Sequence, residues 1–187
     1  VDFMDRDDQP MVRFMERVAR AAAERRLVVN FHGAPKPTGL ERAYPNLLTR
    51  EAVLGHEYDM WSDRVTPDHA LTLPFVRMQA GAMDFEGGTM TNGTRRSFRV
   101  VEERPMNQGT RAQQAAQYVV YDSPLSYLAA SASEYRAEMG FARLLAEIPT
   151  VWDETRALGG AVGDSLVVAR RRGAEWWLAG LTDWTPR

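Results

Sequence analysis

A helical pattern lies between two short apolar runs at the start of the chain. From Pro10 to Arg26 apolar residues recur at intervals of three and four, with charged residues on the other side, which is typical of an amphipathic helix. Asp7 and Asp8 precede it where a cap and a first-turn acid belong. Residues 1–4 read as the end of a buried strand, and residues 27–32 form a mostly apolar run of the kind buried in parallel sheets. Strand, helix and strand in this order predict a parallel α/β fold.

The alternation of strand and helix patterns continues as far as residue 149. We expect a long connection over residues 33–50, with at most a short helix near residues 40–44. After about Thr150 the pattern changes to two strand-like runs, and Gly173 lies between them at a hairpin turn. We expect further strands at 52–55, 82–85, 124–128, 166–169 and 176–181, and further helices at 71–79, 110–121 and 135–147.

Composition narrows the class of protein. The 187 residues include 44% hydrophobic and 26% charged residues, which is typical of a globular protein with a sizeable core. The 23 basic and 25 acidic side chains leave a net charge of −2 without a long block of either sign, so we expect no nucleic-acid partner. No apolar run approaches the ~20 residues that a membrane-spanning helix requires. The chain has no cysteine, which excludes disulfides and thiol catalysis.

Ionisable side chains follow several of the expected strands. In (β/α)₈ barrels the active residues lie where strands pass into the following loops. Two carboxylates that converge there from different strands could cleave a glycosidic bond, one as nucleophile or base and the other as proton donor. This rule selects Asp2, Asp5, His32, His56, Glu57 and Asp84.

Each of these residues also has a purely structural interpretation. Acids near the first helix serve equally well as loop or capping residues, and this applies to Asp5. His32 and His56 are as typical of hydrogen-bonded wall residues as of functional ones. Trp61 fits either core packing or a platform on which a sugar ring stacks. Spacing alone leaves these alternatives open.

Longer motifs add a family resemblance. In order along the chain, residues 1–9, 30–40, 44–58, 72–78 and 149–156 resemble glycoside hydrolase family 97, so the resemblance covers essentially the whole sequence. It implies a large enzyme with an N-terminal β-sandwich, a catalytic (β/α)₈ barrel and a C-terminal β domain. Residues 1–149 would then hold barrel strands four to eight, and residues 150–187 the beginning of an antiparallel C-terminal β domain. The N-terminal domain and the first three strands would lie outside this chain, and the family suggests secretion to the periplasm or cell exterior.

The resemblance also implies a reaction. Members are inverting α-glucosidases or retaining enzymes that resemble α-galactosidases, and Asp2 stands where retaining members carry their nucleophile. Glu57 matches the proton donor, whose pKa we expect burial and the charge of Asp2 to raise. In retaining glycosidases the two carboxyl groups lie about 5–5.5 Å apart. The expected substrate is an α-galactoside, with an α-glucoside as the alternative. A third hypothesis is a catalytically incomplete fragment or carbohydrate-binding remnant, because half a barrel has an open sheet edge.

Further residues match the family's pocket. His32 and Lys36 resemble residues that bind sugar hydroxyls, and we expect Trp61 and Asp84 to contact the substrate as well. The family often requires calcium, which binds hard oxygen ligands. Asp68 is the ligand that the resemblance implies in this chain.

Overall fold

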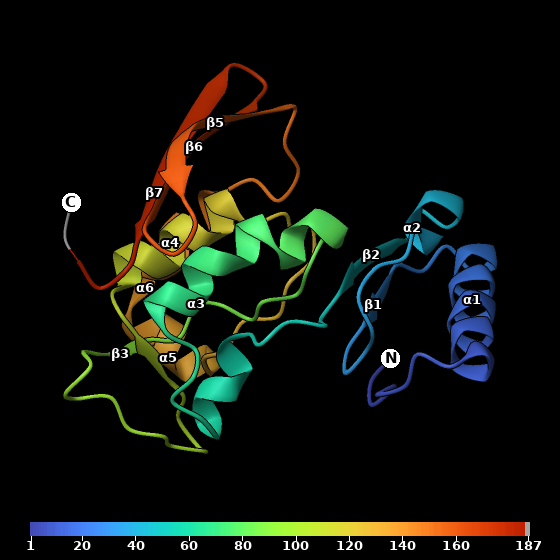
Figure 1. Ribbon diagram of the computed structural model, residues 1–187, viewed down its shortest axis with the longest axis horizontal. Coiled ribbons are helices and arrows are strands. Elements are labelled where there is room, and N and C mark those ends of the chain that lie inside the picture. Colours follow the sequence, from blue (N-terminus) through green and yellow to red (C-terminus); the bar gives the residue numbers. More distant parts are fainter. Residues whose placement is uncertain (186–187) are drawn as a thin grey trace.

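Parallel backbone segments lie side by side in chain order and form the frame that carries the site. The computed structural model describes residues 1–185 (Figure 1). Strand β1 (Val29–Phe31) pairs in parallel with β2 (Leu47–Arg50), and Arg50 forms a parallel bridge to Met83. On the other side of β1, the Val1 N–H₃⁺ donates to the Asn30 carbonyl at 3.1 Å and the His32 N–H donates to the Val1 carbonyl at 2.9 Å. Neighbours in the sheet are thus neighbours in sequence, as in part of a (β/α)₈ barrel.

Helices and further strands surround this frame. Within residues 1–185 no helix is long and apolar enough to cross a membrane. The remaining elements are α1 Gln9–Glu24, α2 Leu40–Ala43, the 3₁₀ helices η1 His56–Met60, η2 Leu73–Phe75 and η3 Arg77–Ala80, α3 Pro67–Thr72, β3 Thr91–Gly93, β4 Met106–Gln108, α4 Arg111–Val120, α5 Ala132–Ala137, α6 Met139–Glu147, β5 Glu154–Ala161, β6 Ser165–Arg172 and β7 Glu175–Thr182.

Helix α1 packs beside β1 and β2, at one end of the molecule (Figure 1). Asp8 is its N-cap, because the carboxylate accepts from the Met11 N–H at 3.1 Å, as the sequence predicts. Met15 of the helix is buried in one apolar cluster with Val29 and Phe31 of β1. The predicted helix and the strand after it are therefore confirmed, whereas residues 1–4 form no strand and join β1 only through the two backbone hydrogen bonds of Val1.

An antiparallel sheet of three strands forms the other end of the molecule, in the order β5-β6-β7 (Figure 1). Gly173, with φ +59°, makes the tight turn between β6 and β7, so the predicted hairpin is confirmed. Leu166 and Leu181 of the sheet pack in one core with Val119 and Val120 of α4. The sequence pattern did not reveal β5, because that strand is almost entirely exposed and carries no apolar alternation. Residues 186 and 187 of the expected C-terminal domain lie outside the described residues.

Several predicted strands are wrong: residues 52–55 and 124–128 form no strand, and residues 82–85 contribute only an isolated bridge at Met83. The parallel strand that follows β1 is Leu47–Arg50 rather than residues 52–55, and the error came from the polar residues of this strand. Arg50 is buried, with its guanidinium 3.3 Å from the Met15 sulfur and stacked over the Phe31 ring at 5.4 Å. The segment beside Met83 is the one that directly follows α4, where the Asp122 carbonyl accepts from the Met83 N–H at 3.0 Å.

The predicted helices are present, but two of them are divided into shorter elements. The predicted helix over residues 135–147 is divided into α5 and α6, which meet at Glu138 with φ −120° and ψ 47°. The one predicted over residues 71–79 continues from α3 as two 3₁₀ turns, because Pro74 cannot supply the N–H that an α-helix needs.

Arg77 joins the carboxyl end of β2 to the start of the segment that contains Met83. Its buried guanidinium donates to the carbonyls of Arg50, Glu51, Ala52 and Gly81, each at 2.9 Å. Burial lowers the pKa of this guanidinium to about 10. One side chain therefore holds two backbone segments that lead into the site, residues 50–52 and the segment that begins at Gly81.

Candidate active site

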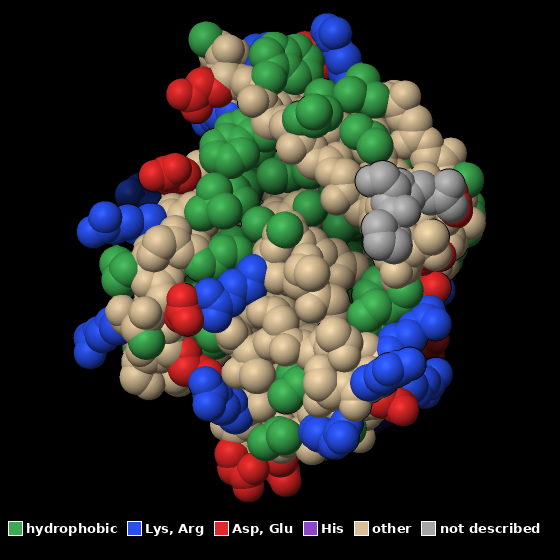
Figure 2. All heavy atoms as spheres, turned by 90° about the vertical axis from the view of Figure 1, so that its left-hand side faces the viewer, with side chains coloured by type: hydrophobic (Ala, Val, Ile, Leu, Met, Phe, Trp, Pro, Cys, Tyr) green, Lys and Arg blue, Asp and Glu red, His purple; other side chains and the backbone are tan. Residues whose placement is uncertain are grey.

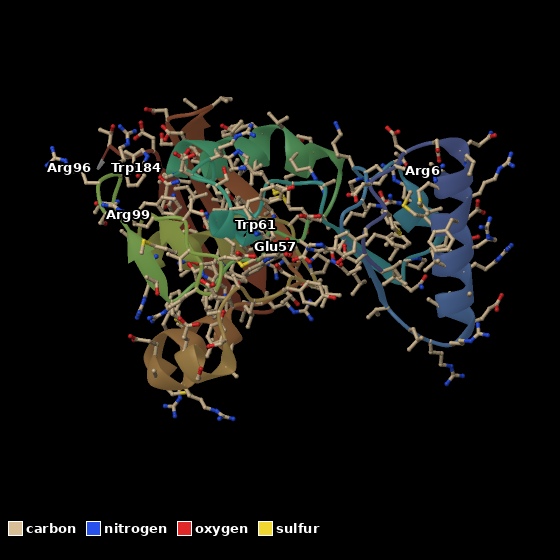
Figure 3. The ribbon with its side chains drawn as sticks, turned by 90° about the horizontal axis from the view of Figure 1, so that it is seen from below. Arg6, Glu57, Trp61, Arg96, Arg99 and Trp184 are labelled. Carbon is tan, nitrogen blue, oxygen red and sulfur yellow. The ribbon has the colours of Figure 1, made fainter. Side chains whose placement is uncertain are left out.

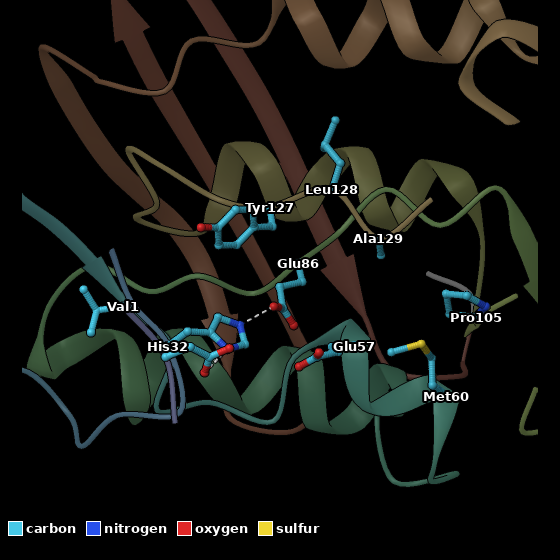
Figure 4. Close-up of a pocket in the computed structure, with 10 residues that line it drawn as sticks. Val1, His32, Glu57, Met60, Glu86, Pro105, Tyr127, Leu128 and Ala129 are labelled. Carbon is cyan, nitrogen blue, oxygen red and sulfur yellow. Dashed lines mark hydrogen bonds and ion pairs between the residues drawn. The ribbon is translucent and has the colours of Figure 1, made fainter. Parts of the chain in front are cut away.

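A cavity of about 370 Å³ opens at the carboxyl ends of the parallel segments (Figure 4). Asp2 and Glu57, the two carboxylates to which the resemblance assigns the reaction, line it. They come from separate segments of the frame, which shows that strand ends bring distant residues together here. The other lining residues are Val1, His32, Met60, Glu86, Pro105, Tyr127, Leu128 and Ala129.

Asp2 follows directly on the backbone that pairs with β1. Its side chain is 50% exposed, and Oδ1 lies 3.5 Å from Nδ1 of His32. The same oxygen accepts from the Phe3 N–H at 2.6 Å. Phe3 has φ +55°, a left-handed conformation that is costly for a bulky residue, so the turn after Asp2 is held by its surroundings. These contacts fix the direction in which the carboxylate points.

Glu57 lies in the first turn of η1, and its position depends on its neighbours in sequence. Gly55 approaches strand segment 83–86 so closely that a Cβ there would lie 2.9 Å from the Phe85 carbonyl oxygen. His56 is buried, with Nδ1 3.0 Å from Oδ2 of Asp59 and Nε2 2.8 Å from Oε1 of Gln117. His56 is therefore a wall residue that ties η1 to α4, while Glu57 faces the cavity.

His32 lies at the centre of the acidic side chains. Nε2 is in hydrogen-bond contact with Oε1 of Glu86, and Nδ1 lies 3.6 Å from Oε2 of Glu51. Burial lowers the pKa of His32, but the hydrogen bond to Glu86 and the charges of Glu86, Glu51 and Asp84 outweigh it, and the net pKa is raised. The surroundings thus favour a positively charged imidazolium.

Glu86 is the most perturbed acid in the cavity. Burial, opposed by the hydrogen bond to His32 and reinforced by the charges of Glu57 and Asp84, raises its pKa to about 7. Its φ is +55°, a left-handed backbone conformation that costs free energy in a residue other than glycine. Oε2 is buried and has no hydrogen-bond partner among the described residues. Perturbed acids of this kind cluster at functional sites.

Glu57 meets the electrostatic requirement of a proton donor. Burial raises its pKa, and the charges of Glu51, Asp2 and Asp84 raise it further, against the opposing charge of His32. A carboxyl group that keeps its proton nearer to neutral pH can protonate a leaving oxygen.

Asp84 lies behind the cavity instead of lining it. The side chain is completely buried, and Oδ2 accepts from Nδ2 of Asn30 at 3.1 Å. Oδ1 accepts from the Ser126 hydroxyl at 2.8 Å and from the Tyr127 N–H at 3.0 Å. Asp84 therefore links β1, segment 83–86 and the loop that carries Tyr127 into the site.

Three other residues that the sequence singles out lie outside this cavity. Lys36 is exposed in the connection before α2. Trp61 directly follows η1, close to Glu57 (Figure 3), but its ring lines a separate cleft. Asp68 lies in the first turn of α3 and lines that same cleft, with Oδ2 3.9 Å from a guanidinium nitrogen of Arg95.

The structure adds two acids that the sequence reasoning missed, Glu51 and Glu86. Glu51 directly follows β2, so the rule of strand ends would have selected it if that strand had been placed correctly. Glu86 lies two residues after Asp84, just beyond the segment bridged at Met83, so the rule of strand ends that selected Asp84 could have reached it as well.

Hard oxygen donors in this cluster fit a calcium ion. His32, Glu51, Glu57 and Glu86 each offer a ligand atom within 4.8 Å of the others. The Oε2 of Glu86, which has no hydrogen-bond partner among the described residues, favours a cation at this cluster, because a buried carboxylate oxygen is costly without a partner. Glu57 suits a cation less well, because a bound cation would oppose the protonated form that a proton donor needs.

The parallel segments and the acidic cavity at their carboxyl ends define the class of protein: the chain is part of a (β/α)₈ barrel with an acidic site at its strand ends. Sequence models of known protein families support this classification. The sequence model described as glycoside hydrolase 97 matches residues 1–53, and the one described as glycosyl-hydrolase 97 C-terminal, oligomerisation, matches residues 151–187.

Similar proteins identify the family. A retaining alpha-galactosidase from Bacteroides thetaiotaomicron is 44% identical over all of this chain and 28% of its own length. A probable retaining alpha-galactosidase from Streptomyces bingchenggensis is 35% identical over 96% of this chain and 26% of its own length. The chain thus spans less than a third of these relatives.

Solved structures give the same result. A glycoside hydrolase family 97 enzyme from Pseudoalteromonas sp. in complex with acarbose superposes with a TM-score of 0.82 at 35% identity, over 97% of this chain and 28% of that one. A beta-arabinopyranosidase superposes with a TM-score of 0.83 at 30% identity, over 97% of this chain and 29% of that one. The chain belongs to glycoside hydrolase family 97 and corresponds to a segment of its longer members.

Proposed function

We propose that this chain carries the catalytic carboxylates of a retaining α-galactosidase, with Asp2 as nucleophile and Glu57 as acid and base. The observation that carries the proposal is that Asp2 and Glu57, 55 positions apart in the sequence, line one cavity in which burial and nearby acids raise the pKa of Glu57. An acid that holds its proton beside a solvated carboxylate is the division of roles that retaining cleavage requires.

The proposed reaction has two steps. An Asp2 carboxylate oxygen attacks the anomeric carbon while Glu57 donates its proton to the glycosidic oxygen, and the bond to the leaving group breaks. Water then attacks the glycosyl-enzyme as Glu57 takes a proton from it, which releases the sugar and restores Asp2. His32, whose Nδ1 lies 3.5 Å from Oδ1 of Asp2, would orient the nucleophile.

Calcium is part of the proposal. Glu51 and Glu86 would supply carboxylate oxygens to it, while Glu57 remains free to carry its proton. Calcium takes six to eight oxygen ligands, so water, substrate or other parts of the full-length protein would complete the set. When bound, the cation would supply positive charge that orients sugar hydroxyls.

A galactoside is the substrate best supported by the relatives. The two curated relatives are described as retaining or probable retaining alpha-galactosidases. The beta-arabinopyranosidase agrees with this, because β-L-arabinopyranose has the configuration of α-D-galactopyranose at every ring carbon that both share. The alternative is an α-glucosidase, since relatives from Pseudoalteromonas sp. were solved with acarbose and with panose. We further propose secretion to the periplasm or cell exterior, as expected for the family.

The decisive experiment uses the full-length protein that contains this chain. It compares aryl α-D-galactoside, α-D-glucoside and β-L-arabinopyranoside, and NMR identifies the anomer released first. We expect the galactoside to be hydrolysed fastest and α-galactose to appear first. Asp2→Gly should be inactive, and added azide should restore turnover and yield β-galactosyl azide. Release of β-galactose, or no azide product, would refute Asp2 as nucleophile.

A further inference from the structure

Trp61 contributes to a second cleft, distinct from the catalytic cavity. This cleft has a volume of about 760 Å³, which falls in the range of about 300–1,000 Å³ typical of ligand sites. Its lining comes from the end of η1, from α3, from the loop after β3, from β4 and from the segment after β7. The residues are Trp61, Ser62, Asp63, Thr66, Asp68, Arg95, Phe98, Arg99, Val100, Gln108 and Trp184.

Two indole rings dominate the cleft. Trp61 is 52% exposed, and Tyr58 packs edge-on against its ring at 5.7 Å, which fixes the ring's orientation. Trp184 is partly exposed, and the Arg95 guanidinium stacks over its ring at 5.1 Å. Exposed, oriented aromatic rings offer a flat apolar surface at little entropic cost. The C–H face of a pyranose matches such a surface.

The polar residues of the cleft suit a neutral ligand. Two carboxylates, Asp63 and Asp68, and two guanidinium groups, Arg95 and Arg99, line it and balance in charge. Arg99 is held in place by the carbonyls of Arg96 and Phe98, at 2.9 and 2.6 Å. Figure 2 shows the corresponding end of the molecule, where basic side chains gather at the lower right with acidic ones among them. Planar charged groups of both signs hydrogen-bond hydroxyls well without selecting an anion.

The short helix η1 connects the two sites. Glu57 and Met60 of this helix line the catalytic cavity, and Trp61, the next residue, lines the cleft (Figure 3). Glu57 is the group that would protonate the leaving oxygen. A ligand that extends from Glu57 on the leaving-group side and passes over the end of η1 therefore reaches Trp61 first.

We propose that the cleft binds the leaving-group sugars of a neutral oligosaccharide whose terminal α-galactose occupies the catalytic cavity. Trp61 and Trp184 serve as stacking platforms, and the charged residues hold the hydroxyls. This inference rests on the proposed function, because the direction of the oligosaccharide is set by Glu57. It makes the protein selective for chain length, which the catalytic cavity alone would not do.

Calorimetry on the full-length protein tests the proposal, with Glu57→Gln present throughout to stop turnover. The probes are galactose and an α-1,6-linked galactotriose. We expect the trisaccharide to bind at least about tenfold more tightly than galactose, and Trp61→Ala or Trp184→Ala to remove about that factor. Trp184→Phe should keep most of the affinity, because an aromatic platform remains.

Trp176→Ala is the matched control. Trp176 is 45% exposed and stacked by Arg156 at 4.8 Å, but it lies on β7 outside the cleft, so its loss should leave both affinities unchanged. Equal affinity for the two probes, or trisaccharide binding that ignores both cleft tryptophans, would overturn the proposal. If the trisaccharide binds through these tryptophans but the wild-type protein hydrolyses no α-galactoside, the cleft is supported as a sugar-binding site and the proposed reaction is refuted.

Discussion

The His32 imidazole and the Glu86 carboxylate are in direct hydrogen-bond contact inside the cavity, although 54 positions separate them in the chain (Figure 4). His32 follows β1, and Glu86 follows the segment bridged to β2. The contact therefore joins two strand ends across the site. It also couples the charge of the imidazole to an acid whose pKa is about 7.

Replacing Glu57 by glutamine should separate good from poor leaving groups. Glutamine cannot donate a proton, so we expect kcat/KM to fall by about 10²–10⁴ for an alkyl galactoside and much less for a nitrophenyl galactoside. Steady-state rates on both substrates measure this. Glu102→Gln, at an exposed loop position, is the control and should behave as wild type. Equal losses on both substrates would contradict the acid role.

The same proton predicts a pH profile. Because the pKa of Glu57 is raised, activity should persist above the ordinary range of a carboxylic acid and decline as pH rises through that pKa, when the donor is lost. Measurement of kcat/KM against pH with the alkyl galactoside should show this basic limb. If Glu57→Gln keeps the same limb, another group is responsible for it.

Glu86 should make the metal-free protein less stable as pH rises. Its pKa is raised from 4.5 to about 7 in the folded state, so between these values the folded protein binds more protons than the unfolded chain. The free energy of unfolding should therefore decrease from pH 4.5 to about 7, by up to ~3 kcal/mol. Chemical denaturation in chelator at several pH values measures this. In Glu86→Gln the decrease should shrink to the part that Glu57 and His32 contribute, because folding raises the pKa of both.

Calcium should stabilise the protein through Glu51 and Glu86. We expect calcium to raise Tm and chelator to reverse the change, because a ligand that binds only the folded state stabilises it. Glu51→Gln should weaken this response. Asp68→Asn should leave it intact, since Asp68 lines the other cleft near Arg95. The reverse result would assign the ion to Asp68.

Arg77→Met should destabilise the frame below the site. The substitution leaves the carbonyls of Glu51, Ala52 and Gly81 without this donor, and each unsatisfied buried group costs about 1–3 kcal/mol. The Arg50 carbonyl still accepts from the Asp84 N–H at 3.1 Å. A loss of several kcal/mol in the free energy of unfolding is expected. Arg13→Met, on the exposed side of α1, is the control for the loss of charge. Similar stability of the two variants would argue against the role assigned to Arg77.

Elements with a strong local pattern could be predicted from the sequence. The helix α1 and its cap at Asp8, and the hairpin of β6 and β7, follow from spacing and turn residues that act over a few positions. The strand β2 could not be predicted, because Thr49 and Arg50 are polar and yet buried. Their partners come from α1 and the neighbouring strand segments, and no local pattern contains them.

The sequence by itself determined the helix α1 with the strand after it and the antiparallel hairpin, and its family resemblance selected Asp2, Glu57 and His32 as residues of one pocket. Only the tertiary structure decided that Glu86 joins them and that Asp84 is buried behind them. It also placed Trp61 in a separate cleft. The physical reason is that periodicity reports which face a side chain takes relative to its neighbours in sequence. Which strand ends then share a cavity depends on backbone pairing between residues tens of positions apart.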